Sequence, residues 1–101
     1  MSAYSEYKEL IEKVRILLEL HGLEAQKFYY NKRSMKIRDL TSTKGDLHGE
    51  CLVVARELMR HSDISQVNVV NRLKVVSASR AFAFGEKEHL VSITVHFRSR
   101  T

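Results

Sequence analysis

Residues 91–98 alternate strictly between apolar and polar side chains, and this run restricts the fold more than any other feature of the chain. Val91, Ile93, Val95 and Phe97 alternate with Ser92, Thr94, His96 and Arg98. A period of two predicts a β-strand that buries one face and exposes the other. We therefore expect a sheet with one apolar face against the core and one polar face.

Two other segments have the period of a helix with one buried face. In residues 5–21 the apolar positions are Tyr7, Leu10, Ile11, Val14, Leu17 and Leu18. Gly22 follows, and glycine readily takes the left-handed conformation that ends a helix. In the second segment the apolar positions are Leu47, Cys51, Val54, Ala55, Leu58 and Met59. Thr43 or Asp46 can cap its start, and residues 61–63 mark its end.

Residues 26–40 predict a β-hairpin. Two short runs, 27–30 and 35–38, flank the polar turn 31–34. In the second run Met35 and Ile37 alternate with Lys36 and Arg38, so one face of that strand is apolar and the other cationic.

β-Branched residues dominate from Ile64 onward, which favours strands. A second hairpin is expected, with a turn at residues 85–88 and a strand that contains Phe82 and Phe84. Residues 64–79 also fit helical spacing, so a third helix stays open as an alternative for that segment.

Together these elements predict an α+β fold. Two amphipathic helices pack on one face of a mostly antiparallel sheet of about four strands, in the chain order α-β-β-α-β-β. No proline, linker or low-complexity run divides residues 1–101, and a chain of this length supports one core, so we expect a single compact domain.

The charge of the chain favours an anionic partner. Seventeen Lys and Arg against twelve Asp and Glu leave a net charge of +5. Nucleic acid is the first partner class that this charge suggests, and an acidic protein surface is the second. A basic surface that serves only solubility is the alternative.

One cysteine, Cys51, excludes an intrachain disulfide and suits a reducing compartment. The chain has no apolar run of about 18 residues and no basic leader followed by an apolar stretch. We therefore expect a cytoplasmic protein that neither spans nor is targeted to a membrane.

The hairpin interleaves basic and aromatic residues, a combination suited to RNA or single-stranded DNA. Cations neutralise phosphates, and aromatic faces stack on unpaired bases. The predicted binding residues are Lys27, Tyr29, Tyr30, Lys32, Arg33, Lys36, Arg38 and Lys44. Arg72, Lys74, Arg80, Arg98 and Arg100 would extend this set if the strands pair suitably. In the alternative interpretation, Phe28 and one tyrosine simply pack into the core.

A cysteine near a helix start, in Gly49-Glu50-Cys51, precedes His89 at the start of a later strand. This order resembles the core of papain-like and transglutaminase-like enzymes, and the resemblance implies a Cys51 nucleophile activated by His89. No Asp or Asn follows His89 to orient its ring. Cys51 also lies on an apolar stripe, where an unpaired cysteine commonly serves as a small buried hydrophobic residue. We therefore expect a protein that is not an enzyme and keep Cys51 and His89 as the catalytic alternative.

His48-Gly49-Glu50 resembles the His-x-Glu half of a zinc-dependent deaminase signature. The Pro-Cys-x-x-Cys half is missing, because the chain has no proline and one cysteine. The sequence thus predicts no metal site and no cofactor.

A further alternative is a protein-interaction or inhibitor module, homodimeric through an exposed strand edge. Short basic α+β chains of this kind resemble accessory proteins of phages and mobile elements.

Overall fold

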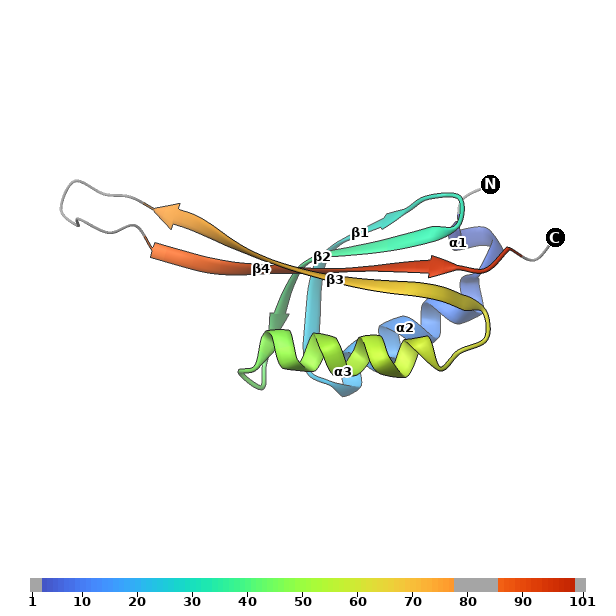
Figure 1. Ribbon diagram of the computed structural model, residues 1–101, viewed down its shortest axis with the longest axis horizontal. Helices are drawn as coiled ribbons and strands as arrows, with labels where there is room; N and C mark the ends of the chain where they lie inside the picture. Colours follow the sequence, from blue (N-terminus) through green and yellow to red (C-terminus); the bar gives the residue numbers. More distant parts are fainter. Residues whose placement is uncertain (1–2, 78–85, 100–101) are drawn as a thin grey trace.

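The computed structural model describes residues 3–77 and 86–99, with side chains for residues 4–72 and 90–99. Along the chain the elements are α1 (Ala3–Glu6), α2 (Lys8–Leu20), β1 (Leu23–Tyr30), β2 (Ser34–Ser42), α3 (Leu47–Met59), β3 (Ile64–Ser77) and β4 (Glu86–Phe97) (Figure 1). The strands form one antiparallel sheet in the order β1-β2-β4-β3. Both long helices cover the same face of this sheet (Figure 1). The predicted α+β class is confirmed, with one short additional helix at the start.

The predicted helix over residues 5–21 is interrupted at Tyr7, so the expectation of one continuous helix was wrong. Tyr7 leaves helical geometry, with φ −118° and ψ 31°, while its carbonyl accepts the first bond of α2 from Ile11. Its buried ring stacks on Phe97 at a centroid distance of 4.6 Å. Its hydroxyl donates to the Arg98 carbonyl at 2.7 Å. We attribute the break to this packing against the last strand, which no local period reveals.

The predicted helix ends agree with the structure. Gly22 follows the cap residue His21 with a φ of +67°, in the left-handed region that glycine tolerates best. A Cβ there would also meet the Thr43 hydroxyl at 2.7 Å. Of the two residues proposed to cap the second helix, Asp46 does so, because its side chain accepts a hydrogen bond from the Gly49 backbone at 3.1 Å.

Residues 64–77 form strand β3, so the helical alternative for this segment is wrong over that range. β3 pairs with β4 from Ile64↔Phe97 to Ser77↔Glu86. The expected turn at 85–88 is wrong for residues 86–88, because these residues belong to β4 and pair with β3. β3 runs further than its apolar pattern indicated and therefore supplies partners for them. The expected strand with Phe82 and Phe84 lies outside the described residues.

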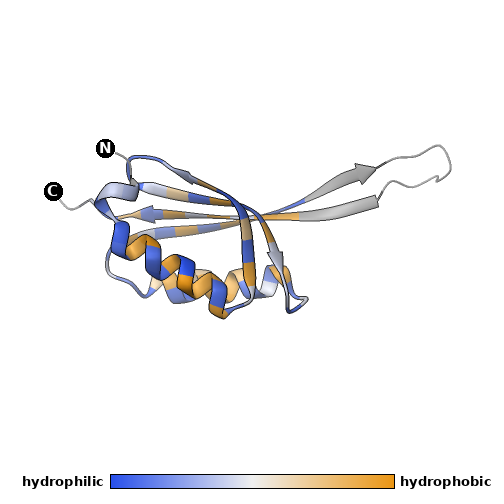
Figure 2. Cartoon of the chain, turned by 180° about the vertical axis from the view of Figure 1, so that it is seen from behind, coloured by the Kyte–Doolittle hydropathy of each residue, from blue (hydrophilic) through white to orange (hydrophobic). Residues whose placement is uncertain are grey.

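Hydrophobic and hydrophilic residues alternate along the strands (Figure 2). This alternation separates a buried face of the sheet from an exposed one. Ile37 and Ile93 are paired, face the helices and are fully buried. They join side chains of α2 and α3 in one hydrophobic cluster. The opposite face carries no helix, and its side chains are mostly polar.

β3 and β4 extend beyond the other two strands and give the molecule an elongated shape of 57 × 26 × 17 Å (Figure 1). β2 pairs with β4 only as far as Leu40↔Val91, so the rest of β4 pairs with β3 alone. In the part of the chain that the structure describes, no helix is long and apolar enough to cross a membrane.

Candidate nucleic-acid interface

The helix-free face of the sheet collects the basic residues of β1 and β2. Because Met35 and Ile37 are buried under the helices, the alternating Lys36 and Arg38 project from the opposite face and are exposed. The strand register places Lys27 opposite Arg38 and Tyr29 opposite Lys36. These four side chains share one face because their positions are paired across an antiparallel ladder.

β3 and β4 continue this face with uncharged polar side chains. Lys36 pairs with Thr94, which in turn pairs with Asn68. Thr94 and Ser92 are partly exposed, and Asn68 is exposed. Next to Asn68 along the same face come Val70 and then Arg72, by the two-residue period of β3.

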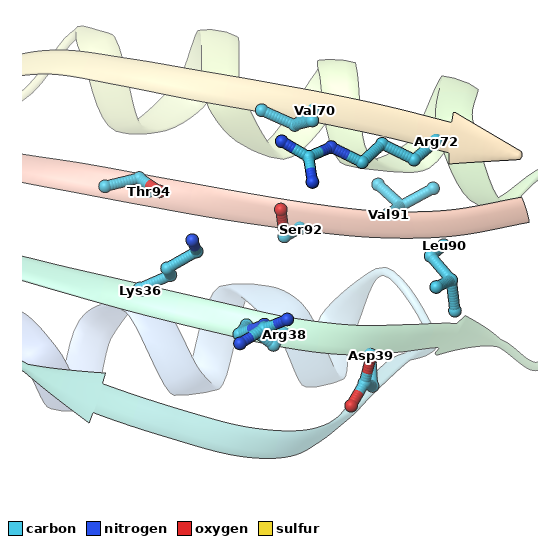
Figure 3. A pocket seen from close by; sticks show the side chains of 9 residues that line it. All are labelled: Lys36, Arg38, Asp39, Val70, Arg72, Leu90, Val91, Ser92 and Thr94. Atoms are coloured by element: carbon cyan, nitrogen blue, oxygen red, sulfur yellow. The ribbon is translucent and has the colours of Figure 1, made fainter. Parts of the chain in front are cut away.

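A shallow hollow of about 130 Å³ lies on this face. Three cations from two strands surround it: Lys36 and Arg38 from β2, and Arg72 from β3 (Figure 3). The other lining residues are Asp39, Val70, Leu90, Val91, Ser92 and Thr94. Asp39 is therefore the one carboxylate among nine lining residues, and the hollow is a cationic surface with hydroxyl groups between the charges.

A β-bulge shapes one side of the hollow. The register between β2 and β4 shifts between Ile37 and Leu40, and Asp39 has a φ of +55°. Aspartate tolerates this left-handed conformation better than most residues. A bulge bends its strand and increases the local twist, so it turns the end of β2 away from the flat part of the sheet.

Tyr29 adds an exposed aromatic ring beside the cations. The residue is 44% exposed, and the Arg38 guanidinium carbon lies 5.8 Å from the ring centroid. An aromatic ring on an open sheet face can stack on an unpaired base, and the neighbouring guanidinium can bind a phosphate.

The structure separates the other predicted binding residues from this face. Tyr30 points to the helix side, where its hydroxyl accepts from Arg15 Nη2 at 2.6 Å and its ring contacts Tyr4 edge-on. Lys32 and Arg33 are exposed in the loop between β1 and β2. Lys44 follows β2, and its Nζ donates to the Leu20 carbonyl at 3.5 Å, near the end of α2.

Of the five residues proposed to extend the basic set, the structure brings Arg72 to the hollow. Arg98 follows the end of β4, and its backbone N–H donates to the Asp63 carbonyl. The side chains of Lys74, Arg80 and Arg100 lie outside the described residues. Sequence reasoning did not assign Ser92, Thr94 and Asn68 to the site. Ser92 and Thr94 are the polar positions of the β4 alternation. Only the strand register shows that these positions and Asn68 of β3 share a face with Lys36.

The catalytic alternative depends on Cys51, and this thiol is fully buried in the core. Burial, followed by the nearby Glu50 carboxylate, raises the pKa of the Cys51 thiol to about 11. A nucleophilic cysteine needs the opposite, an accessible thiol with a lowered pKa. His89 lies on β4 opposite Leu73, in the part of β4 that pairs with β3 alone.

The rate of alkylation should show whether Cys51 is a buried thiol with a raised pKa or an accessible, nucleophilic one. At pH 8 a thiol with a pKa near 11 has about a hundredfold less thiolate than one with the pKa of 9.0. We therefore expect iodoacetamide to modify the native protein at least about a hundredfold more slowly than the urea-unfolded protein, followed by intact mass. Equal rates would show an accessible, ionisable Cys51 and would restore the enzyme alternative.

The residues of the deaminase-like motif do not form a metal centre together. Glu50 Oε2 lies 2.9 Å from His21 Nδ1, a hydrogen bond between the end of α2 and the start of α3, and His48 is exposed. Within residues 3–77 and 86–99, no group of three His, Cys, Asp or Glu side chains is placed to hold a metal ion.

Comparisons with protein-family models, with curated proteins and with solved structures gave no match.

Proposed function

We propose that this protein is a non-enzymatic domain that binds single-stranded nucleic acid, RNA or DNA, on the helix-free face of its sheet. The observation that carries the proposal is the convergence of Lys36, Arg38 and Arg72 on one hollow (Figure 3). Tyr29 is exposed next to Arg38. The proposal includes a cytoplasmic location, which the single free cysteine suits.

The chemistry of this face suits a single strand better than a duplex. A single strand can place its phosphates on the cations and its unstacked bases on an aromatic ring and on hydroxyl or amide groups. Ser92, Thr94 and Asn68 supply such groups between the charged residues. In a duplex the bases are paired and stacked, and Tyr29 would have no base face to contact.

The electrostatics give the proposal a measurable signature. Binding of a single strand releases counterions, so the logarithm of affinity falls with the logarithm of salt by about 0.7 for each phosphate neutralised. Three or four cations on the face, counting Lys27, predict a slope of about −2 to −3. If attraction depended only on the net charge of the whole chain, replacing these cations would weaken binding no more than replacing cations elsewhere.

Removing the Tyr29 ring should weaken binding without changing the salt slope. We expect Tyr29→Ala to lower the affinity for single-stranded RNA or DNA by about 1 to 3 kcal/mol, the range for loss of one base–aromatic stack. Tyr29→Phe keeps the ring and should bind nearly as the parent does. Fluorescence anisotropy at two salt concentrations measures both effects. A loss in Tyr29→Phe as large as that in Tyr29→Ala would contradict stacking and indicate a role for the hydroxyl.

The first experiment compares labelled single-stranded RNA, single-stranded DNA and duplex DNA by anisotropy at low and near-physiological salt. Micromolar or tighter binding of a single strand that persists at physiological salt, with weaker binding of the duplex, supports the proposal. Binding that is equal for all three and vanishes with salt rejects it. In that case the basic face serves solubility or contacts an acidic protein surface.

A further inference from the structure

The edge strand β3 presents an uncharged backbone ladder to solvent. β4 is its neighbour on one side, and none of the other described strands pairs with it. Residues 64–71 contain no charged side chain, in a chain whose net charge is +5. An uncharged edge without proline lacks the usual protection against pairing with another strand.

An apolar groove of about 410 Å³ runs beside this edge, between α3 and β3. Leu52 and Met59 of α3 line it and are 39% and 47% exposed. Val67 and Val69 of β3 line it from the sheet side and are half-buried. Arg56 is the one charged residue in the lining. The edge and the groove therefore form one continuous surface that combines apolar side chains with a strand edge that no second described strand covers.

We propose that a second copy of this chain occupies this surface, with the two β3 strands paired antiparallel about a two-fold axis at Asn68. In this register Val67 of each copy lies opposite Val69 of the other, so apolar side chains meet on the helix side. The Arg72 residues lie near opposite ends of the paired segment. Two copies with the same net charge of +5 repel each other. This repulsion is smallest where the contact surfaces carry no charge, as residues 64–71 do.

The same axis brings the two α3 helices side by side and antiparallel. Leu52 of one copy then lies near Met59 of the other, so the exposed apolar residues of the groove become buried. Arg56 lies midway between them and meets its counterpart near the axis. Salt should therefore strengthen the dimer by screening this repulsion and the repulsion between net charges, whereas it weakens nucleic-acid binding. The inference does not depend on the proposed function.

Sedimentation equilibrium of the full chain tests the dimer. We expect reversible dimers whose dissociation constant is equal or lower in higher salt. Met59→Lys should raise the dissociation constant about a hundredfold, because the two-fold axis repeats a roughly tenfold loss in both copies. Ile16→Lys is the matched control, since Ile16 is 53% exposed on α2, away from this groove, and should leave the constant unchanged. A monomer up to several hundred micromolar, or a larger effect of Ile16→Lys than of Met59→Lys, overturns the proposal.

Disulfide trapping tests the register. Asn68→Cys places two thiols across the axis, at a Cβ spacing of about 5 Å, and should give a covalent dimer under mild oxidation. Gln66→Cys lies on the same exposed face, but the two copies of this residue are roughly 13 Å apart in the proposed register and should not cross-link. The parent chain, whose one cysteine is Cys51, is the control for cross-linking through Cys51 itself. Faster cross-linking of Gln66→Cys than of Asn68→Cys overturns the register.

Discussion

Reversing the charges of Lys36 and Arg38 together should lower the affinity for single-stranded RNA or DNA by about a hundredfold at low salt. Both residues line the hollow on the helix-free face, and both are exposed. Lys36→Glu with Arg38→Glu removes two phosphate contacts and places two carboxylates beside Asp39. The salt slope should become shallower by about 1.4, since each lost contact contributes about 0.7.

The control for this variant changes the net charge equally at another place. Lys8→Glu with Lys13→Glu reverses two exposed cations on α2, and we expect it to weaken binding only about threefold or less, through the long-range field. Lys32→Glu with Arg33→Glu, in the loop between β1 and β2, should have an intermediate effect. Anisotropy titrations of the three double variants rank them by their affinity for single-stranded RNA or DNA. Equal losses would show that binding depends on net charge and not on the helix-free face.

Removing the Tyr7 ring should have the largest effect on stability. Tyr7 is 1% exposed, stacks on Phe97 and donates a hydrogen bond to the Arg98 carbonyl. Tyr7→Ala leaves a cavity at this contact and should lower the free energy of unfolding by about 3 to 5 kcal/mol. A domain of this size is stable by roughly 5 to 15 kcal/mol, so this loss is a large part of the total, and Tyr7→Ala is expected to unfold if the parent lies at the low end of that range.

Two further variants keep this prediction testable if Tyr7→Ala does not fold. Tyr7→Phe retains the stacked ring and should cost only about 1 kcal/mol, the usual value of one hydrogen bond. Tyr4→Ala removes a ring that is 46% exposed, so we expect a loss of no more than about 1 kcal/mol. Urea unfolding followed by circular dichroism gives all three values. A cost for Tyr4→Ala as large as that for Tyr7→Ala, or a cost of about 3 kcal/mol or more for Tyr7→Phe, would contradict a specific role of the stack on Phe97.

The elements of the fold could be predicted because their apolar periods are local properties of the chain. The stripe over Leu47, Cys51, Val54 and Leu58 and the alternation of Met35 with Ile37 each follow from residues that are neighbours in sequence. Errors arose where distant residues decide the conformation. The break at Tyr7 depends on Phe97, and the extension of β4 to Glu86 depends on β3 as its partner.

The candidate site was predictable only in part for the same reason. Sequence alternation placed Lys36 and Arg38 on one face, but it left open whether Tyr29 or Tyr30 joined them, because a shift of one residue exchanges the faces of a strand. The pairing of Tyr30 with the buried Met35 turns Tyr30 toward the helices and leaves Tyr29 on the open face.

The sequence by itself determined the α+β class, the position of both long helices, the hairpin of β1 and β2, and a basic surface. It determined these because side-chain periodicity and charge act over a few residues. Only the tertiary structure decided that Arg72 meets Lys36 and Arg38 around one hollow, and that β3 is left at the edge of the sheet. Strand order and register follow from the packing of the whole core, where residues far apart in the chain must fit together at once.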